Sequence, residues 1–76
     1  MKVTVKLFAF LRKGRFKTSD IELASGTTVL QVLDYLSISA DERSIGIIFV
    51  NGRHAKLDCV LEEGDVLAIF PPVAGG

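Results

Sequence analysis

Residues 2–8 alternate between polar and apolar side chains, which is the pattern of a β-strand buried on one face only. The side chains of the buried face are Val3, Val5 and Leu7. Phe8 falls on the opposite face, together with two lysines and a threonine. The pattern therefore predicts an opening strand whose outer face ends in an aromatic ring.

A second strand is predicted from Phe16 to Leu23, with Ile21 and Leu23 facing inward. Ser19-Asp20 interrupts the alternation, and we expect a β-bulge or a local twist there. Residues 9–14, between the two strands, contain a glycine and two basic residues. They are expected to form the loop of an antiparallel hairpin.

The sequence from Thr28 carries the start signal of an α-helix. Thr28 and Gln31 match a capping box, in which the side chain of each residue accepts a hydrogen bond from the backbone N–H of the other. Apolar residues then recur at helical spacing and predict a buried stripe made of Val29, Leu30, Val32, Leu33 and Leu36. A helix that ends near Ser37 is unstable alone in water, so this stripe must pack on a sheet.

Three further strands are predicted in the second half of the chain. The run Ile45–Val50 is almost wholly apolar, which is typical of a strand covered on both faces. Asn51-Gly52 favours a tight hairpin turn, and a short return strand is expected from Arg53 to Lys56. After an apolar segment at 57–61 and an acidic turn, Val66–Phe70 forms the last strand.

The predicted order is strand, strand, helix, strand, short strand, strand. A helix between two hairpin-like pairs indicates an α+β fold, with a mixed sheet of four to five strands and one main helix packed on one face. The first and last strands are expected to lie side by side and parallel at the centre of the sheet. We interpret residues 1–70 as one domain and residues 71–76 as a C-terminal tail.

The chain closes with a tail that has no side chain at its end. Pro71 and Pro72 lack a backbone N–H, so they end sheet pairing and favour an extended path. Gly75 and Gly76 have no Cβ and can enter a narrow channel. Residues 71–76 reach about 20 Å at about 3.3 Å per residue, long enough to deliver the Gly76 carboxylate to another protein. A frayed terminus is the alternative interpretation.

Composition narrows the class of function. The 76 residues, 49% of them hydrophobic, suffice for one small domain with an efficient core. Nine basic residues balance nine acidic ones, which argues against nucleic acid as the main partner. The single cysteine, Cys59, excludes an internal disulfide and fits a reducing compartment. No membrane span and no signal peptide are predicted, so a cytoplasmic location is expected.

Two single residues are candidates for chemistry. His54 is the one histidine, so no metal site is expected, and an exposed place at a hairpin tip is favoured over contact with a partner. Cys59 is a candidate nucleophile or persulfide carrier. A core position is favoured for it, because it stands among apolar residues and free cysteine is usually buried.

Two clusters of charge have alternative interpretations. The acidic cluster consists of Glu62, Glu63 and Asp65. It suggests a cation site or, more simply, a solvated turn. The basic cluster either guides an acidic partner or forms a plain charged loop, and it consists of Arg12, Lys13 and Arg15.

An interface is predicted on the face of the sheet that lies away from the helix. Phe8, Phe70 and one alternate set of residues within 47–50 fall on that face. Apolar side chains grouped on an open face beside the tail mark a surface for partner binding. Ordinary exposed apolar residues are the alternative.

The tail Phe70-Pro71-Pro72-Val73-Ala74-Gly75-Gly76 resembles the end of the small subunit of molybdopterin synthase. That subunit belongs to the ubiquitin-like sulfur-carrier family, whose fold is the β-grasp. The resemblance covers the whole chain and includes Phe8, the Gly26-x-Thr28-Val29 helix start, Val50-Asn51 and the Glu63-Gly64-Asp65 turn. The connector at residues 9–15 looks shorter than in that family. The resemblance implies a ubiquitin-like β-grasp fold.

The resemblance also implies a function for the tail. Gly76 would be adenylated by an E1-like enzyme that uses ATP, and a sulfur donor would convert the adenylate to a thiocarboxylate. The tail would enter the large synthase subunit, and the complex of the two subunits is expected to be a heterotetramer. The tail residues that would enter are Gly75, Ala74, Val73, Pro72 and Pro71. The chain alone would bind no cofactor and catalyse nothing, and it would donate sulfur within a sulfurtransferase complex.

Other functions of the same tail stay open. The acceptor could belong to thiamine-thiazole synthesis, tRNA thiolation or another sulfur pathway. Pro71-Pro72-Val73 favours the molybdopterin pathway, because the thiamine-pathway carrier typically lacks the double proline. A protein modifier joined to lysine, or a plain interaction module, is the third hypothesis.

Overall fold

The computed structural model describes residues 1–41 and 45–72. The strands in this part of the chain are β1 (Lys2–Leu7), β2 (Thr18–Glu22), β3 (Ile47–Val50), β4 (Arg53–His54) and β5 (Val66–Phe70). The helices are the 3-10 helix η1 (Ala9–Arg12) and the α-helix α1 (Val29–Tyr35). Neither helix is long and apolar enough to cross a membrane, and the same holds throughout the described residues.

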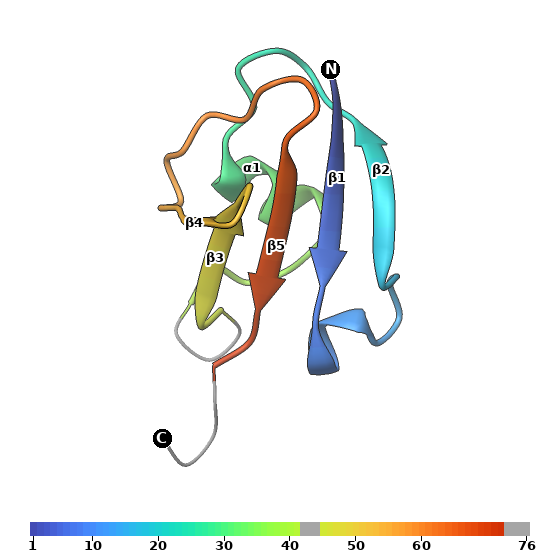
Figure 1. Ribbon diagram of the computed structural model, residues 1–76. Helices are drawn as coiled ribbons and strands as arrows, with labels where there is room; N and C mark the ends of the chain where they lie inside the picture. Colours follow the sequence, from blue (N-terminus) through green and yellow to red (C-terminus); the bar gives the residue numbers. More distant parts are fainter. Residues whose placement is uncertain (42–44, 73–76) are drawn as a thin grey trace.

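The strands form one mixed sheet with the order β2-β1-β5-β3-β4. β1 and β5 are parallel neighbours at its centre, and Figure 1 shows their arrowheads pointing the same way. The other three pairings are antiparallel. This arrangement confirms the predicted mixed sheet with the first and last strands side by side, which is the β-grasp topology.

The core lies between one face of the sheet and α1, which crosses behind the sheet in Figure 1. Strands contribute alternate residues, as expected for a sheet with a single covered face. The buried side chains are Val3, Val5, Leu7, Leu11, Ile21, Val29, Val32, Leu33, Ile38, Ile48, Leu61, Leu67 and Ile69.

Helix α1 has only seven residues, and its first turn is held by side chains and by a loop. The Gln31 N–H donates to Thr28 Oγ1 at 3.3 Å, and the Thr28 N–H donates to Gln31 Oε1 at 2.9 Å. The predicted capping box is thus confirmed. The N–H groups of Val29 and Leu30 donate to carbonyl groups at Cys59 and Leu57. Backbone donors that a helix leaves unpaired at its start are therefore satisfied here.

The prediction that Leu30 belongs to the buried stripe is wrong, because its side chain is 39% exposed. Each residue turns the helix by about 100°, so Leu30 points about 100° away from Val29 and about 160° away from Val32. The other four predicted positions are buried or pack against the core.

The prediction that residues 45–50 are covered on both faces is also wrong. The strand begins at Ile47, and Ile48 is buried while Ile47 is 38% exposed. Within the described residues α1 covers one face of the sheet, so Ile47 and Phe49 face outward, whereas Val50 packs against the core.

No bulge occurs at Ser19-Asp20, so the first of the two alternatives predicted there, a β-bulge or a local twist, is wrong. The pairing of β1 with β2 is continuous from Lys2↔Glu22 to Lys6↔Thr18. Ser19 pairs with Val5 as a half-buried residue, and Asp20 accepts a hydrogen bond from Thr4 Oγ1 at 2.7 Å. The alternation therefore continues with a small polar residue at an inward position.

The connector after β1 is more ordered than a plain loop. Leu11 of η1 is buried, and the side chain of Arg15 donates to the carbonyl groups of Leu11, Leu36 and Ser37. These bonds tie the connector to the end of α1.

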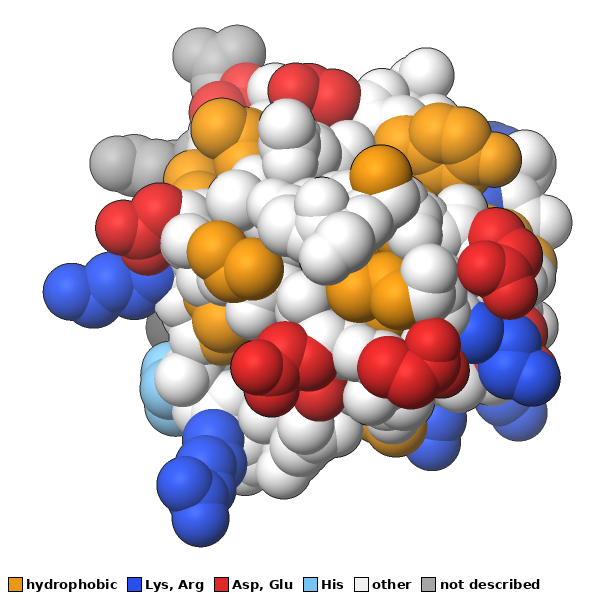
Figure 2. All heavy atoms as spheres, turned by 90° about the horizontal axis from the view of Figure 1, so that it is seen from above, with side chains coloured by type: hydrophobic (Ala, Val, Ile, Leu, Met, Phe, Trp, Pro, Cys, Tyr) orange, Lys and Arg blue, Asp and Glu red, His pale blue; other side chains and the backbone are white. Residues whose placement is uncertain are grey.

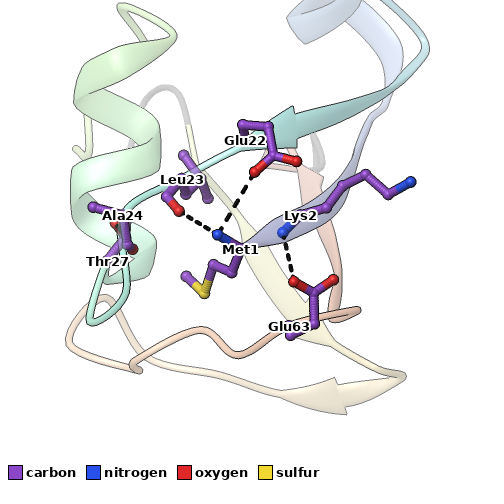
Figure 3. A network of polar contacts seen from close by, with 7 residues as sticks. All are labelled: Met1, Lys2, Glu22, Leu23, Ala24, Thr27 and Glu63. Carbon is purple, nitrogen blue, oxygen red and sulfur yellow. Dashed lines mark hydrogen bonds and ion pairs between the residues drawn. The ribbon is translucent and has the colours of Figure 1, made fainter.

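The start of β1 is held by polar contacts at the opposite end of the sheet (Figure 3). The Met1 amino group donates to the Leu23 carbonyl at 2.7 Å and lies 3.6 Å from a Glu22 carboxylate oxygen. The Lys2 N–H donates to Glu63 Oε1 at 3.0 Å. These contacts fix the register in which β1 enters the sheet.

Replacing Thr28 with Ala is expected to lower the free energy of unfolding by about 1 kcal/mol, because the Gln31 N–H loses its capping partner. Urea denaturation measures this change. Ser25→Ala is the control, since Ser25 is an exposed residue of the preceding turn. Equal effects of the two substitutions would contradict a structural role for the capping box.

Candidate functional site

Two phenylalanines meet at the edge where the central strands end. The parallel register pairs Leu7 with Ile69, so Phe8 and Phe70 come next on both strands. Their rings stack with centroids 4.1 Å apart and planes inclined by 12°. The structure therefore brings together the two residues predicted to bind a partner.

Phe49 of β3 joins this pair. Its ring meets Phe70 edge-on, with centroids 5.8 Å apart and an angle of 89°. The imidazole ring of His54 in β4 also meets the Phe49 ring edge-on, with the ring centroids 4.9 Å apart. We call Phe8, Phe49 and Phe70 the aromatic patch. Edge-to-face and offset contacts of this kind stabilise an aromatic cluster beyond the area that it buries.

The aromatic patch lies on the open face of the sheet. Leu67 and Ile69 enter the core, so Phe70 and Ala68 face outward, as do Phe49 and Ile47 on the neighbouring strand. A groove of about 330 Å³ runs across this face, and it is lined by Lys6, Phe8, Phe49, Gly52, Val66, Ala68 and Phe70. Apolar side chains thus form a continuous surface at this edge.

The end of the molecule where β1 begins is different. Figure 2 looks onto that end and shows small groups of hydrophobic side chains separated by acidic and basic ones. Scattered apolar residues are ordinary on a protein surface, whereas a contiguous apolar face marks a binding surface. The open face at the end of β1 and β5 is therefore the candidate functional site.

Arg12 places a positive charge at the rim of the aromatic patch. Its Nε donates to the Leu7 carbonyl at 2.7 Å, and its guanidinium carbon lies 5.4 Å from the centre of the Phe8 ring. This geometry is a cation–π contact. The sequence grouped Arg12 with Lys13 and Arg15, but only Arg12 touches the patch. Arg15 is bound to backbone carbonyls, and Lys13 is exposed.

The tail leaves the sheet beside the patch. Pro71 and Pro72 follow Phe70 directly and are half-buried. The N–H of Gly46, just before β3, donates to the Phe70 carbonyl at 2.8 Å. The remaining residues of the predicted tail, Val73, Ala74, Gly75 and Gly76, lie outside the described residues. Their entry into a partner stays a prediction.

The other candidates from the sequence lie elsewhere. Cys59 is half-buried and packs against the core, with its Sγ 3.8 Å from the Val60 carbonyl oxygen. This position agrees with the core role that was favoured. His54 is exposed in the short hairpin, also as expected.

The acidic turn accepts internal hydrogen bonds. The two carboxylate oxygens of Asp65 accept from the Asn51 side chain and from the Glu62 N–H, both at 2.8 Å. Glu63 accepts from the Lys2 N–H. Within residues 1–41 and 45–72, no group of histidine, cysteine and acidic side chains could hold a metal ion. These carboxylates therefore close a turn.

Within the described residues, the mixed sheet and the one α-helix packed on it define a ubiquitin-like β-grasp fold. The chain belongs to the ThiS family, whose model matches residues 5–76. It is accordingly a ubiquitin-like sulfur carrier, as the resemblance implied. No curated protein matches the chain.

Solved structures from archaea and bacteria share the fold. A chain named molybdopterin converting factor subunit 1, from Pyrococcus furiosus, is 33% identical, with a TM-score of 0.76 and coverage of 96% of this chain and 99% of that one. SAMP1 from Haloferax volcanii is 30% identical over 100% of both chains, also with a TM-score of 0.76. A protein from Helicobacter pylori, solved as a complex of subunits 1 and 2 of molybdopterin-converting factor, is 24% identical over 100% of both chains, with a TM-score of 0.66. At that identity the last likeness shows the fold alone.

A double-mutant cycle tests the stacked pair. Phe8→Ala and Phe70→Ala are expected to show a coupling energy of about 1 kcal/mol in urea denaturation, because either substitution alone removes the ring contact. Phe10→Ala combined with Phe70→Ala is the matched control, since Phe10 is 55% exposed and makes no ring contact within the described residues. Additive effects in the first cycle would contradict the stacking.

Proposed function

We propose that this chain is the sulfur-donating small subunit of a molybdopterin synthase and that Gly76 carries the sulfur as a thiocarboxylate. The observation that carries the proposal is the double role of Phe70. Its ring belongs to the aromatic patch, and its carbonyl begins the tail that ends in Gly-Gly. A partner that binds the patch therefore lies at the root of the tail.

The tail suits activation at its end. A carboxylate is a poor acyl donor, because oxide is a poor leaving group. Attack of the Gly76 carboxylate on the α-phosphate of ATP, within an E1-like enzyme, would give an acyl-adenylate and pyrophosphate. Sulfide could then displace AMP and leave a thiocarboxylate. Glycine at this position leaves the acyl carbon uncrowded, because it has no Cβ.

The thiocarboxylate would act inside the partner. Its sulfur is ionised at neutral pH and is a good nucleophile, so it can attack an electrophilic carbon of the acceptor. Residues 71–76 span about 20 Å when extended, at about 3.3 Å per residue, so the active site can lie well inside the large subunit. The chain itself supplies the sulfur, and the large subunit supplies the remaining catalytic groups.

One comparison supports this choice of acceptor, and a second shares the fold alone. The Pyrococcus furiosus relative, at 33% identity, is named as subunit 1 of a molybdopterin converting factor. The structure from Helicobacter pylori holds subunits 1 and 2 of such a factor in one complex. We infer that the aromatic patch of this chain docks on a large subunit of the same kind, in the heterotetramer that the resemblance implies.

A second candidate function is protein modification. It is favoured by the 30% identity to SAMP1, one structure of which is described as small archaeal modifier protein 1. Activation at Gly76 would be the same, but a lysine amine would take the acyl group and an isopeptide bond would form. Sulfur donation in thiamine-thiazole synthesis shares the thiocarboxylate and differs in the acceptor alone.

Incubation with ATP, the activating enzyme and sodium sulfide is expected to raise the intact mass by the difference between sulfur and oxygen. The chain that lacks Gly75 and Gly76 is expected to keep its mass, because the group under attack has moved to another residue. Mass spectrometry of the intact chain and of its C-terminal peptide measures both results.

Cys59→Ser is the control in that experiment. It should gain sulfur as the unsubstituted chain does, since Cys59 packs against the core. Addition of a whole sulfur atom that disappears in Cys59→Ser would indicate a cysteine persulfide and would contradict the proposal. Isopeptide-linked conjugates in cell extract, with no thiocarboxylate, would favour the modifier.

The docking surface can be tested separately. Phe49→Asp is expected to weaken binding to the large subunit at least about tenfold, because it buries a charge at an apolar contact. Phe10→Asp is the matched control and should bind with unchanged affinity, since Phe10 is already 55% exposed and lies outside the patch. Isothermal titration calorimetry measures both dissociation constants. Equal weakening by the two variants would argue against the patch as the docking surface.

A further inference from the structure

Gly46 faces the root of the tail in an irregular pairing. In the register of β3 with β5, Phe70 is opposite Ile47. The Phe70 carbonyl nevertheless accepts a hydrogen bond from the N–H of Gly46, one residue earlier, at 2.8 Å. This hydrogen bond departs by one residue from the register of β3 with β5, at the point where the regular pairing of the two strands ends.

The backbone of the tail passes through the space that a side chain at position 46 would need. A Cβ on Gly46 would lie 2.6 Å from the Pro71 carbonyl oxygen, 2.7 Å from Pro72 Cα and 2.8 Å from the Pro71 carbonyl carbon. All three atoms are backbone atoms, so no rotamer change relieves the overlap. Any residue other than glycine must move the Pro71-Pro72 segment or move itself.

Because Pro71 and Pro72 are stiff, this contact determines the direction in which the chain leaves the sheet. Each proline ring fixes its own φ, and Pro72 restricts the backbone of Pro71 as well. Neither proline has an N–H with which to continue the pairing to β3. The path of Pro71 and Pro72 is therefore set by the Phe70 hydrogen bond and by the close approach to Gly46. A cleft of about 430 Å³ lies beside them and is lined by Gly46, Ile47, Phe70, Pro71 and Pro72.

We propose that Gly46 is a positioning residue that aims the tail relative to the docking surface. The inference rests on the function proposed above and adds a residue to it. Ile47, the next residue, is exposed on the same face as the aromatic patch. The aromatic patch and the Pro71-Pro72 segment thus have a fixed relative orientation, and a partner that binds both must be complementary to it. In the proposed function, the first such partner is the ATP-dependent activating enzyme.

Pyrophosphate release by the activating enzyme tests the proposal with full-length chains. In Gly46→Ala, kcat for adenylation is expected to fall by a factor of about 10 to 100, because a displacement near 1 Å at a reacting group can cost about 100-fold. KM for the chain should change less than about twofold, because the proposal places the activating enzyme on the aromatic patch and Gly46→Ala leaves the side chains of that patch unchanged. A role confined to fold stability would lower the melting temperature and leave kcat unchanged in folded protein.

Gly26→Ala is the matched control. Gly26, unlike Gly46, adopts a backbone conformation that disfavours side chains, with φ at +89°, but nothing lies within 4 Å of its added Cβ. It is expected to lose stability and to keep both kinetic constants. A folded Gly46→Ala variant with the kcat of the unsubstituted chain overturns the proposal.

Pro72→Gly covers the case in which Gly46→Ala does not fold. It loosens the other side of the same contact without a change in the core, and kcat should again fall while KM stays within about twofold. Unchanged kcat in this variant overturns the proposal. If the activating enzyme releases no pyrophosphate with the unsubstituted chain, the proposed function fails, and this inference fails with it. Equal kcat values for an active unsubstituted chain and its variants would overturn this inference alone.

Discussion

The parallel pairing of β1 with β5 is the interaction on which the rest of the structure depends. Val5 lies opposite Leu67 and Leu7 lies opposite Ile69, and all four side chains are fully buried. Because the two strands run the same way, both end at one edge of the sheet. Phe8 and Phe70 therefore meet there, and the chain leaves the sheet beside them. Antiparallel pairing would have put the last strand's end, and the tail with it, beside the start of β1.

A small α+β domain with a single α-helix leaves one face of its sheet uncovered. In this chain the uncovered face carries Phe8, Phe49 and Phe70 at one end, in addition to the polar residues that a solvated face usually has. Arg12 adds a positive charge at the rim of the aromatic patch, and the patch itself remains apolar. In the proposed function Phe70 has two roles, because its ring belongs to the docking surface and its carbonyl group begins the tail.

Local signals in the sequence predicted most of the fold. The alternation in residues 2–8 and the Thr28/Gln31 capping box are patterns within a few residues, and the structure confirms both. The failed prediction about which faces of β3 are covered depends on contacts distant in sequence. Gly46 did carry a signal, because an isolated glycine in an apolar strand run often marks a close backbone approach. The sequence alone did not identify what approaches it, since Pro71 and Pro72 reach it only through the order of the sheet.

Hydrogen–deuterium exchange of the chain with and without its large subunit tests the central claim most directly. The claim is that the patch and the tail root form one surface for one partner. The account predicts slower exchange at residues 47–49 and 68–70, at the ends of the strands that carry the patch, with α1 and β2 unchanged. Protection confined to α1 and β2, with the open face of the sheet exchanging as in the free chain, would contradict it.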